Sequence, residues 1–190
     1  MLTFMMQDTR NPREPGEDSR LEELLYRIAL KDEAAFHALY DETRSAVYGF
    51  ALSIVKNTHD AEDIMQETYL AVYKASVSYN SQGKPMAWIL RITRNFALLK
   101  LRDRKRQQPV SWEEIGRWMD ENYHLESEDK IVLEAALNSL SDEERQIVSL
   151  HALGGLRHRE IAQVMDMKLS TVLSKYHRAL KKLRELIGEV

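Results

Sequence analysis

The chain has 190 residues, which suits one domain or two small ones and is too short for most large catalytic scaffolds. With 44% hydrophobic and 30% charged residues but only seven glycines and four prolines, the composition favours helices over a turn-rich β architecture. The absence of cysteine excludes disulfides, thiolate metal sites and thiol catalysis. No apolar run approaches the roughly 18 residues of a membrane span and no signal peptide opens the chain, so we expect a cytoplasmic protein without membrane insertion.

The net charge of −3 conceals four blocks that alternate in sign. Residues 1–80 carry 8 basic and 14 acidic side chains, whereas residues 81–110 carry 8 and 1. Residues 111–144 carry 2 and 11, and residues 145–188 carry 9 and 3. Because the local field rather than the net charge governs binding to polyanions, the two basic blocks indicate two surfaces that face a polyanion. Ordinary solvated helix faces are the alternative interpretation.

Helical periodicity begins at Leu21 and predicts the first of two small helical domains. Residues 1–20 lack such periodicity, and we expect them to form a flexible leader. Two helices are predicted first, a third is expected to begin with Asp60 as its N-cap, and a fourth is expected to begin at Pro85. Together they predict an all-α domain over residues 21–106.

An acidic linker over residues 107–130 is expected to join this domain to a second one over residues 131–187. The sequences SWEE and SDEE match the capping-box pattern, and in the second of them Ser141 and Glu144 would start a helix. The downstream segment REIAQVMDMKLSTVLSKYHRALKKL has the pattern of a helix-turn-helix with Ser170 as the N-cap of the second helix. The predicted fold is therefore all-α, with a helix-turn-helix in the C-terminal domain.

Each basic block places its cations on one face of a predicted helix, opposite an apolar face. The cations of the fourth helix are Arg91, Arg94, Arg102 and Lys105. The polar face of the last helix carries Thr171, Lys175, Arg178 and Lys182. Such rows suit a DNA backbone, and residues near the start of a recognition helix touch base edges. Basic helical surfaces without a DNA partner remain the alternative for both helices.

Three segments together resemble the bacterial RNA polymerase sigma factors of the sigma-70 family, specifically the small extracytoplasmic-function (ECF) type that keeps only regions 2 and 4. They are DAEDIMQETYLAVYKA, PMAWILRITRNFALLKLRDRKR and LSDEERQIVSLHALGGLRHREIAQVMDMKLSTVLSKYHRALKKLREL, and the resemblance covers about residues 31–187. It implies a factor that binds core RNA polymerase and directs promoter-specific initiation. Region 2 would capture the melted minus-ten element, and region 4 would bind the minus-thirty-five element. The resemblance implies no enzyme activity, no catalytic residue, no metal and no cofactor.

The resemblance and the basic faces assign residues to three binding surfaces. The residues expected to contact the clamp helices of the largest polymerase subunit are Asp60, Glu62, Asp63, Gln66 and Glu67. Those expected at the minus-ten element are Asn80, Ser81, Gln82, Lys84, Arg91, Arg94, Asn95, Arg102 and Lys105. Those expected at the minus-thirty-five element are Ser170, Thr171, Leu173, Ser174, Lys175, Arg178 and Lys182. Further implied partners are the polymerase flap, promoter DNA and an anti-sigma factor.

Several positions and two alternatives qualify this interpretation. Asp166 stands where the family usually has glycine, Arg157 replaces the usual N-cap hydroxyl, and Leu173 replaces a common lysine. Trp88 is expected in the core rather than as a stacking platform. A dimeric helix-turn-helix regulator would bind palindromic DNA without polymerase. A helical interaction module or an enzyme without visible chemistry is the other alternative.

Overall fold

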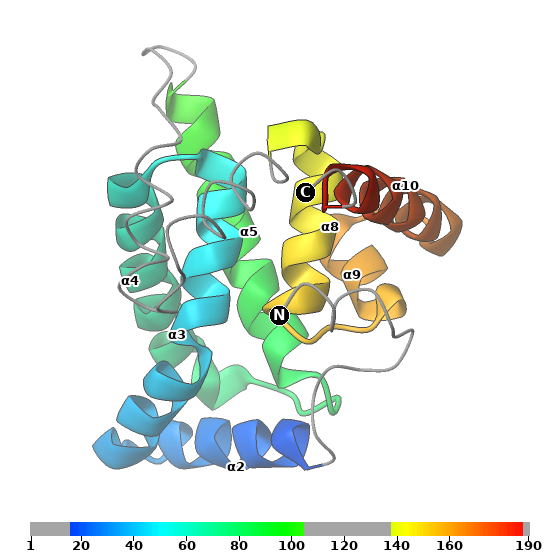
Figure 1. Ribbon diagram of the computed structural model, residues 1–190. Coiled ribbons are helices and arrows are strands. Elements are labelled where there is room, and N and C mark those ends of the chain that lie inside the picture. Colours follow the sequence, from blue (N-terminus) through cyan, green and yellow to red (C-terminus); the bar gives the residue numbers. More distant parts are fainter. Residues whose placement is uncertain (1–15, 105–137, 188–190) are drawn as a thin grey trace.

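The computed structural model describes residues 16–104 and 138–187, and every regular element in these ranges is helical (Figure 1). The N-terminal part holds α2 (Glu17–Ala29), α3 (Glu33–Val55), α4 (Thr58–Ala75), the 3-10 helix η1 (Ser76–Ser78) and α5 (Pro85–Arg104). The C-terminal part holds α8 (Asp142–Ala152), α9 (His158–Met165) and α10 (Leu169–Ile187). The all-α prediction is confirmed. Of the helices described, none is both long and apolar enough to cross a membrane.

Two helices of the N-terminal part begin at other residues than predicted. α2 begins at Glu17, so residues 17–20 are helical and do not belong to a leader. The Asn57 side chain caps α4 by accepting a hydrogen bond of 2.8 Å from the N–H of Asp60. The prediction of Asp60 as the cap was therefore wrong, because an asparagine three residues earlier already satisfies its N–H. Residues 1–15 lie outside the described part of the chain, as do the predicted linker, SWEE and Lys105.

In the C-terminal part, the predicted capping box is confirmed. The N–H of Ser141 donates to Glu144 Oε2 at 3.0 Å, and the N–H of Glu144 donates to Ser141 Oγ at 3.3 Å. α10 begins at Leu169, and the carbonyl of Lys168 accepts the first hydrogen bonds of this helix. Ser170 therefore lies inside the first turn, and the prediction of Ser170 as N-cap was wrong.

α3 is the central helix of the N-terminal part and packs against α2, α4 and α5. Its apolar residues point in several directions, and Val47, Phe50 and Ala51 are fully buried. A helix that is apolar on several sides needs neighbours on several sides. Its polar Thr43 is satisfied in the core by a hydrogen bond of 2.7 Å with the hydroxyl of Tyr69. One further side of α3 faces the C-terminal part.

The C-terminal helices pack directly on the N-terminal ones, with α8 against α3 and α9 against α5 (Figure 1). Glycines permit this close approach. A Cβ atom added at Gly49 would lie 2.6 Å from Leu153 Cδ1, and one added at Gly154 would lie 2.8 Å from Leu90 Cδ1. The buried residues of both parts form one continuous hydrophobic core. The predicted pair of domains is thus joined through a tight interface.

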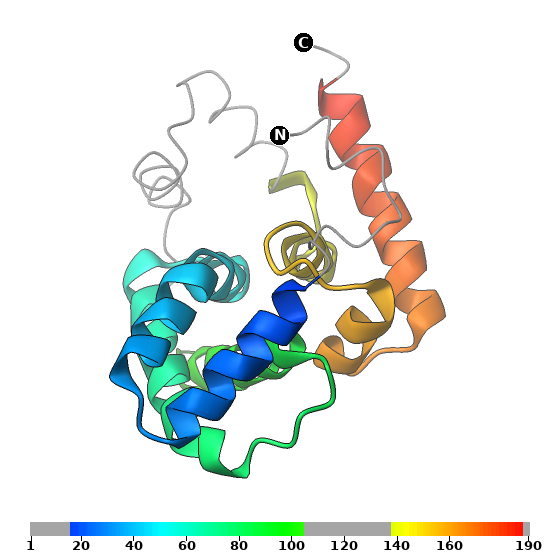
Figure 2. The same ribbon diagram turned by 90° about the horizontal axis from the view of Figure 1, so that it is seen from below.

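Figure 2 shows the order of the helices across this interface: α8 lies between α3 and α10, and α10 forms the outer edge. An ion pair of 2.6 Å between Lys56 Nζ and Asp142 Oδ1 also crosses the interface. Because α8 is covered on two sides, even its polar Arg145 and Gln146 are buried. Because α10, the second helix of the helix-turn-helix, lies on the far side of α8 from α3, its outer face is not covered by the N-terminal part.

Candidate nucleic-acid interface

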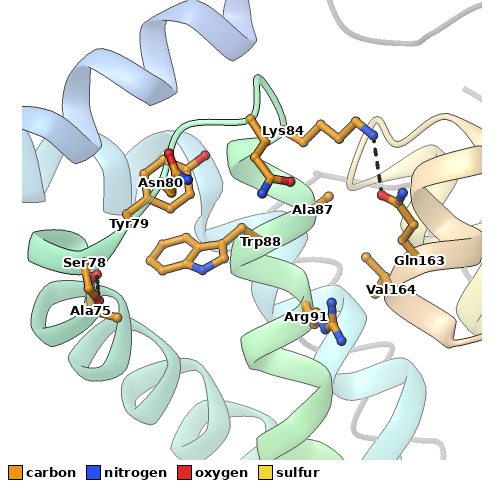
Figure 3. A pocket seen from close by; sticks show the side chains of 11 residues that line it. Ala75, Ser78, Tyr79, Asn80, Lys84, Ala87, Trp88, Arg91, Gln163 and Val164 are labelled. Atoms are coloured by element: carbon orange, nitrogen blue, oxygen red, sulfur yellow. Dashed lines mark hydrogen bonds between the residues drawn. The ribbon is translucent and has the colours of Figure 1, made fainter.

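A cavity of about 350 Å³ lies between α5, α9 and the loop of residues 79–84 (Figure 3). Four residues expected at the minus-ten element line it, namely Asn80, Gln82, Lys84 and Arg91. Gln163 and Val164 of α9 form the opposite wall. Three other expected residues, Ser81, Asn95 and Arg102, are exposed and do not line this cavity. The structure thus brings together amide groups and cations from two elements at one hollow.

Two aromatic side chains form another wall of the same cavity. The rings of Tyr79 and Trp88 lie 4.6 Å apart between centroids, with 52° between their planes. Trp88 packs against the core, as expected, but it also borders the cavity (Figure 3). Aromatic faces are surfaces on which nucleobases stack. The sequence analysis missed Tyr79, although an aromatic residue beside the polar loop NSQGKP was the available signal.

The loop of residues 79–84 is held by an acidic residue of α2. Glu22 Oε1 accepts hydrogen bonds from the Tyr79 hydroxyl at 2.8 Å and from the Gly83 N–H at 3.1 Å. Gly83 has a φ of 67°, a left-handed conformation that glycine adopts without steric cost. Burial is the main reason that the pKa of Tyr79 lies well above its ordinary value, and the hydrogen bond to Glu22 raises it further. The phenol therefore stays a proton donor. The sequence analysis missed Glu22.

The helix-turn-helix covers part of the expected minus-ten surface. Lys84 Nζ donates to Gln163 Oε1 at 3.5 Å across the mouth of the cavity. Arg94 is half-buried, and its Nε atom has no hydrogen-bond partner among the described residues. Burial lowers the pKa of Arg94, whereas the charge of Asp166 acts in the opposite direction. Asp166 itself ends α9 with a φ of 54°, a left-handed turn at the position where the resemblance led us to expect glycine.

The residues expected at the polymerase fall into two groups on α4. Lys100 Nζ of α5 lies 3.0 Å from Asp63 Oδ2 and 3.4 Å from Asp60 Oδ1, and the hydrogen bond that Lys100 donates to Asp63 raises the pKa of Lys100. The other three residues are exposed, and they are Glu62, Gln66 and Glu67. Leu70, whose exposed fraction is 59%, lies one turn after Gln66. This apolar member of the outer face was not predicted.

The inner stripe of α10 is confirmed, since Val172, Tyr176, Ala179 and Leu183 are buried. The cations predicted on its polar face differ in their contacts. Lys175 Nζ lies 2.5 Å from Glu143 Oε2 and its side chain is only 20% exposed. Lys182 Nζ lies 2.7 Å from Glu144 Oε2. Arg178 is 62% exposed, with Nε 3.9 Å from Glu144 Oε1. Lys175 and Lys182 thus join α10 to α8, while Arg178 faces outward.

The outermost face of α10 differs from the predicted one. Its exposed residues include Ser170, Ser174, His177, Arg178 and Lys181. Thr171 and Leu173 are half-buried at its edge. His177 and Lys181 were not predicted as DNA contacts, although their spacing from Ser174 places all three on neighbouring positions of one helix surface.

A histidine cluster packs beneath α10. The rings of His151 and His158 stack with centroids 4.9 Å apart, and the Tyr176 ring lies 5.0 Å and 4.6 Å from them. The pKa of His158 is lowered to about 4, mainly by burial and to a smaller extent by the charges of His151 and His177. No group of three or more potential metal ligands assembles within residues 16–104 and 138–187. The packed rings of this cluster, with His158 favoured in its neutral form, therefore support α10 from below.

Comparisons with known proteins identify both halves. The family model of sigma-70 region 2 matches residues 39–107, and that of sigma-70 region 4 matches residues 130–183. The ECF RNA polymerase sigma factor SigK of Mycobacterium ulcerans is 30% identical over 186 residues, which cover 91% of this chain and 96% of the relative. A SigK of Mycobacterium sp. strain KMS is 28% identical over 191 residues, 95% of this chain and 97% of the relative.

Two solved structures share the fold. CnrH in complex with the cytosolic domain of CnrY has a TM-score of 0.65 at 22% identity, covering 90% of this chain and 98% of that one. The sigma factor RpoE in complex with the anti-sigma factor NepR, from Bartonella quintana, has a TM-score of 0.62 at 23% identity, covering 80% and 96%. The chain therefore belongs to the ECF sigma factors of the sigma-70 family, which are transcription initiation factors.

Proposed function

We propose that this chain binds core RNA polymerase in the cytoplasm and directs it to promoters without catalysing a reaction itself. The domains that we assign are residues 21–106 for region 2 and residues 131–187 for region 4. The observation that carries the proposal is the cavity in which amides and cations of the loop 79–84 and α5 meet two aromatic rings. Such a site is suited to a base that has left the DNA stack.

At the minus-ten element, each group in the cavity has a distinct task. Tyr79 and Trp88 offer ring faces to an extruded base, and the amides of Asn80 and Gln82 can pair with its edges. Lys84 and Arg91 would neutralise the adjoining phosphates, and the exposed Arg102 continues this row about 16 Å along α5. Favourable binding of the unpaired base lowers the free energy of open DNA. Strand opening then needs no side-chain chemistry.

At the minus-thirty-five element, we propose that α10 enters the major groove with its outer face. Ser170 and Ser174 lie near the start of the helix, where base edges come within reach. Leu173 and Thr171 offer apolar contact for a thymine methyl group. Arg178 is largely exposed and its contact with Glu144 is long, so it can meet a phosphate, whereas Lys175 and Lys182 would first have to leave Glu143 and Glu144.

On the polymerase side, we propose that α4 docks on the clamp helices through Glu62, Gln66 and Glu67, with Leu70 supplying apolar contact. Asp60 and Asp63 would support this face through Lys100. Region 4 would bind the polymerase flap. An anti-sigma factor is also a proposed partner, because the solved structures of CnrH and RpoE contain CnrY and the anti-sigma factor NepR, respectively.

The test is run-off transcription by core polymerase from the host on a pool of its genomic fragments, with and without the chain. We expect chain-dependent starts whose upstream sequences share two elements at fixed spacing. Arg178→Ala should weaken these starts, and Arg44→Ala, an exposed cation of α3, is the matched control. No chain-dependent start, combined with palindromic DNA binding by a dimer, would replace the proposal by a polymerase-independent regulator.

A further inference from the structure

We propose that Glu22 of α2 is a positioning residue for minus-ten recognition: its carboxylate ties down both ends of the loop 79–84 and thereby aims Asn80 and Gln82 at the captured base. This inference rests on the proposed function, since it concerns how the same site is shaped. α2 lies before residues 39–107, the segment that matches sigma-70 region 2. The tether thus comes from outside the matched part of the domain.

The geometry of the tether is specific. A single oxygen, Glu22 Oε1, accepts the Tyr79 hydroxyl at 2.8 Å and the Gly83 N–H at 3.1 Å. These donors stand at the two ends of the loop, so one carboxylate spans it. Hydrogen bonds to an ionised group are stronger than those between neutral groups. The tether therefore reduces the number of conformations open to the residues between its two ends.

The residues between these ends are the ones that would meet DNA. Asn80, Ser81 and Gln82 are exposed, and two of them line the cavity. Their amides can pair with a base only when the backbone presents them at the right angle, because a hydrogen bond weakens steeply as it bends. The same tether orients the Tyr79 ring against Trp88, so it sets the aromatic wall together with the polar one.

Glu22 is well placed to act as a fixed point. Its neighbours Leu21, Leu24 and Leu25 are buried and hold α2 on the core. A carboxylate beside a phosphate-binding loop also repels DNA, so simple repulsion is the competing role for this residue. The two roles predict opposite effects when the side chain is removed. Removal of a tether weakens minus-ten recognition, and removal of a repulsive charge strengthens it.

The experiment compares Glu22→Ala and Glu22→Gln in reconstituted holoenzyme, on a promoter used by the wild type and on variants of it at each element. Glu22→Ala should reduce transcription from this promoter about tenfold and flatten the preference for bases in the minus-ten element. The response to minus-thirty-five changes should stay as in the wild type. Glu22→Gln keeps an oxygen acceptor and should restore most of the activity. Glu23→Ala, at the exposed neighbouring position, is the matched control.

A second measurement tests the tether in the free chain and does not depend on transcription. Hydrogen exchange of the Gly83 amide should be about tenfold faster in Glu22→Ala than in the wild type, and nearly unchanged in Glu22→Gln. Equal exchange in Glu22→Ala and wild type would overturn the tether, whatever the chain does with polymerase. Unchanged or increased minus-ten recognition in Glu22→Ala would overturn the positioning role while the sigma function stands. Faster exchange with equal losses at both promoter elements would also overturn it, because a general structural defect affects both.

Discussion

The cavity between α5, α9 and the loop 79–84 differs from α10 in how its basic side chains are used. At the cavity, Arg91 is exposed and Lys84 donates a long hydrogen bond of 3.5 Å to the neutral side chain of Gln163. On α10, Lys175 and Lys182 are bound to carboxylates of α8 at 2.5 Å and 2.7 Å. The same residue types are therefore available to nucleic acid in one region and hold two helices together in the other. A row of cations in a sequence does not distinguish these roles, whereas the location of the partner carboxylates does.

The acidic start of α8 explains this difference. Glu144 completes a capping box with Ser141 and also accepts Lys182, while burial alone would act against its ionised form. The hydrogen bonds from Lys182 and Ser141 outweigh burial and lower the pKa of Glu144. One residue thus fixes both the start of α8 and the position of α10. No comparable acid from α9 pairs with the cations that line the cavity, among the ion pairs of the described residues.

The largest effect is expected from Glu144→Ala. It removes the capping box and the buried carboxylate that accepts a hydrogen bond from Lys182, so we expect a loss of about 2 kcal/mol in the free energy of unfolding. Urea unfolding followed by circular dichroism measures this change. Glu143→Ala, which removes an exposed partner of Lys175, is the control and should cost less than about 1 kcal/mol. Equal costs for the two substitutions would contradict the special role of Glu144.

Arg178→Ala and Lys175→Ala should separate DNA binding from helix anchoring. Arg178→Ala should weaken binding of the minus-thirty-five element about tenfold with little change in stability, because this side chain is largely exposed. Lys175→Ala should lower the stability of region 4 more than Arg178→Ala does, because its ammonium group is mostly covered. Fluorescence anisotropy with promoter DNA and thermal melting measure the two quantities. The reverse order in both assays would refute the distinction.

Acid should weaken region 4 through His158. Its folded pKa of about 4 lies below the ordinary 6.5, so the folded state favours the neutral ring. The contribution is complete above about pH 6.5 and declines as the pH falls from 6.5 towards 4. The full shift corresponds to about 2 kcal/mol between pH 7.5 and pH 5, and because solvent screens the partly exposed ring we expect about half of this value. His158→Gln should flatten this decline in urea unfolding curves. The same slope in wild type and variant would assign the pH dependence to other groups.

The smallest effect distinguishes two neighbours in the loop 79–84. Gln82 lines the cavity and Ser81 does not, although both were predicted at the minus-ten element. We expect Gln82→Ala to reduce transcription from a minus-ten-dependent promoter about threefold and Ser81→Ala to change it less than about twofold. Single-round transcription assays resolve this difference. A larger loss for Ser81→Ala would mean that DNA approaches the loop from outside the cavity.

The sequence predicts those features that depend on short-range spacing. The buried stripe of α10 follows from the period of an α-helix, and the capping box of α8 follows from two residues three positions apart. Even at short range, two candidate caps compete: Asn57 and Asp60 stand three residues apart, and the earlier one caps α4.

Features that depend on tertiary packing could not be predicted from the sequence. Lys175 meets Glu143, and Glu22 meets Gly83, because segments that are distant in sequence lie side by side. The contact of Leu153 with α3 likewise requires Gly49 opposite it, which no periodicity indicates. The candidate site was therefore predictable as a set of polar and basic residues. Its aromatic wall, its tether and its covering by α9 required the structure.

The most direct test of the account is permanganate footprinting of a promoter used by this chain, with core polymerase alone and with the reconstituted holoenzyme. Unpaired thymines react with permanganate, so the assay reports strand opening at the minus-ten element. We predict reactive minus-ten thymines only with the chain present, and weaker reactivity when Gln82→Ala and Lys84→Ala are combined. Equal reactivity with and without the chain would contradict the claim that region 2 captures the opened strand.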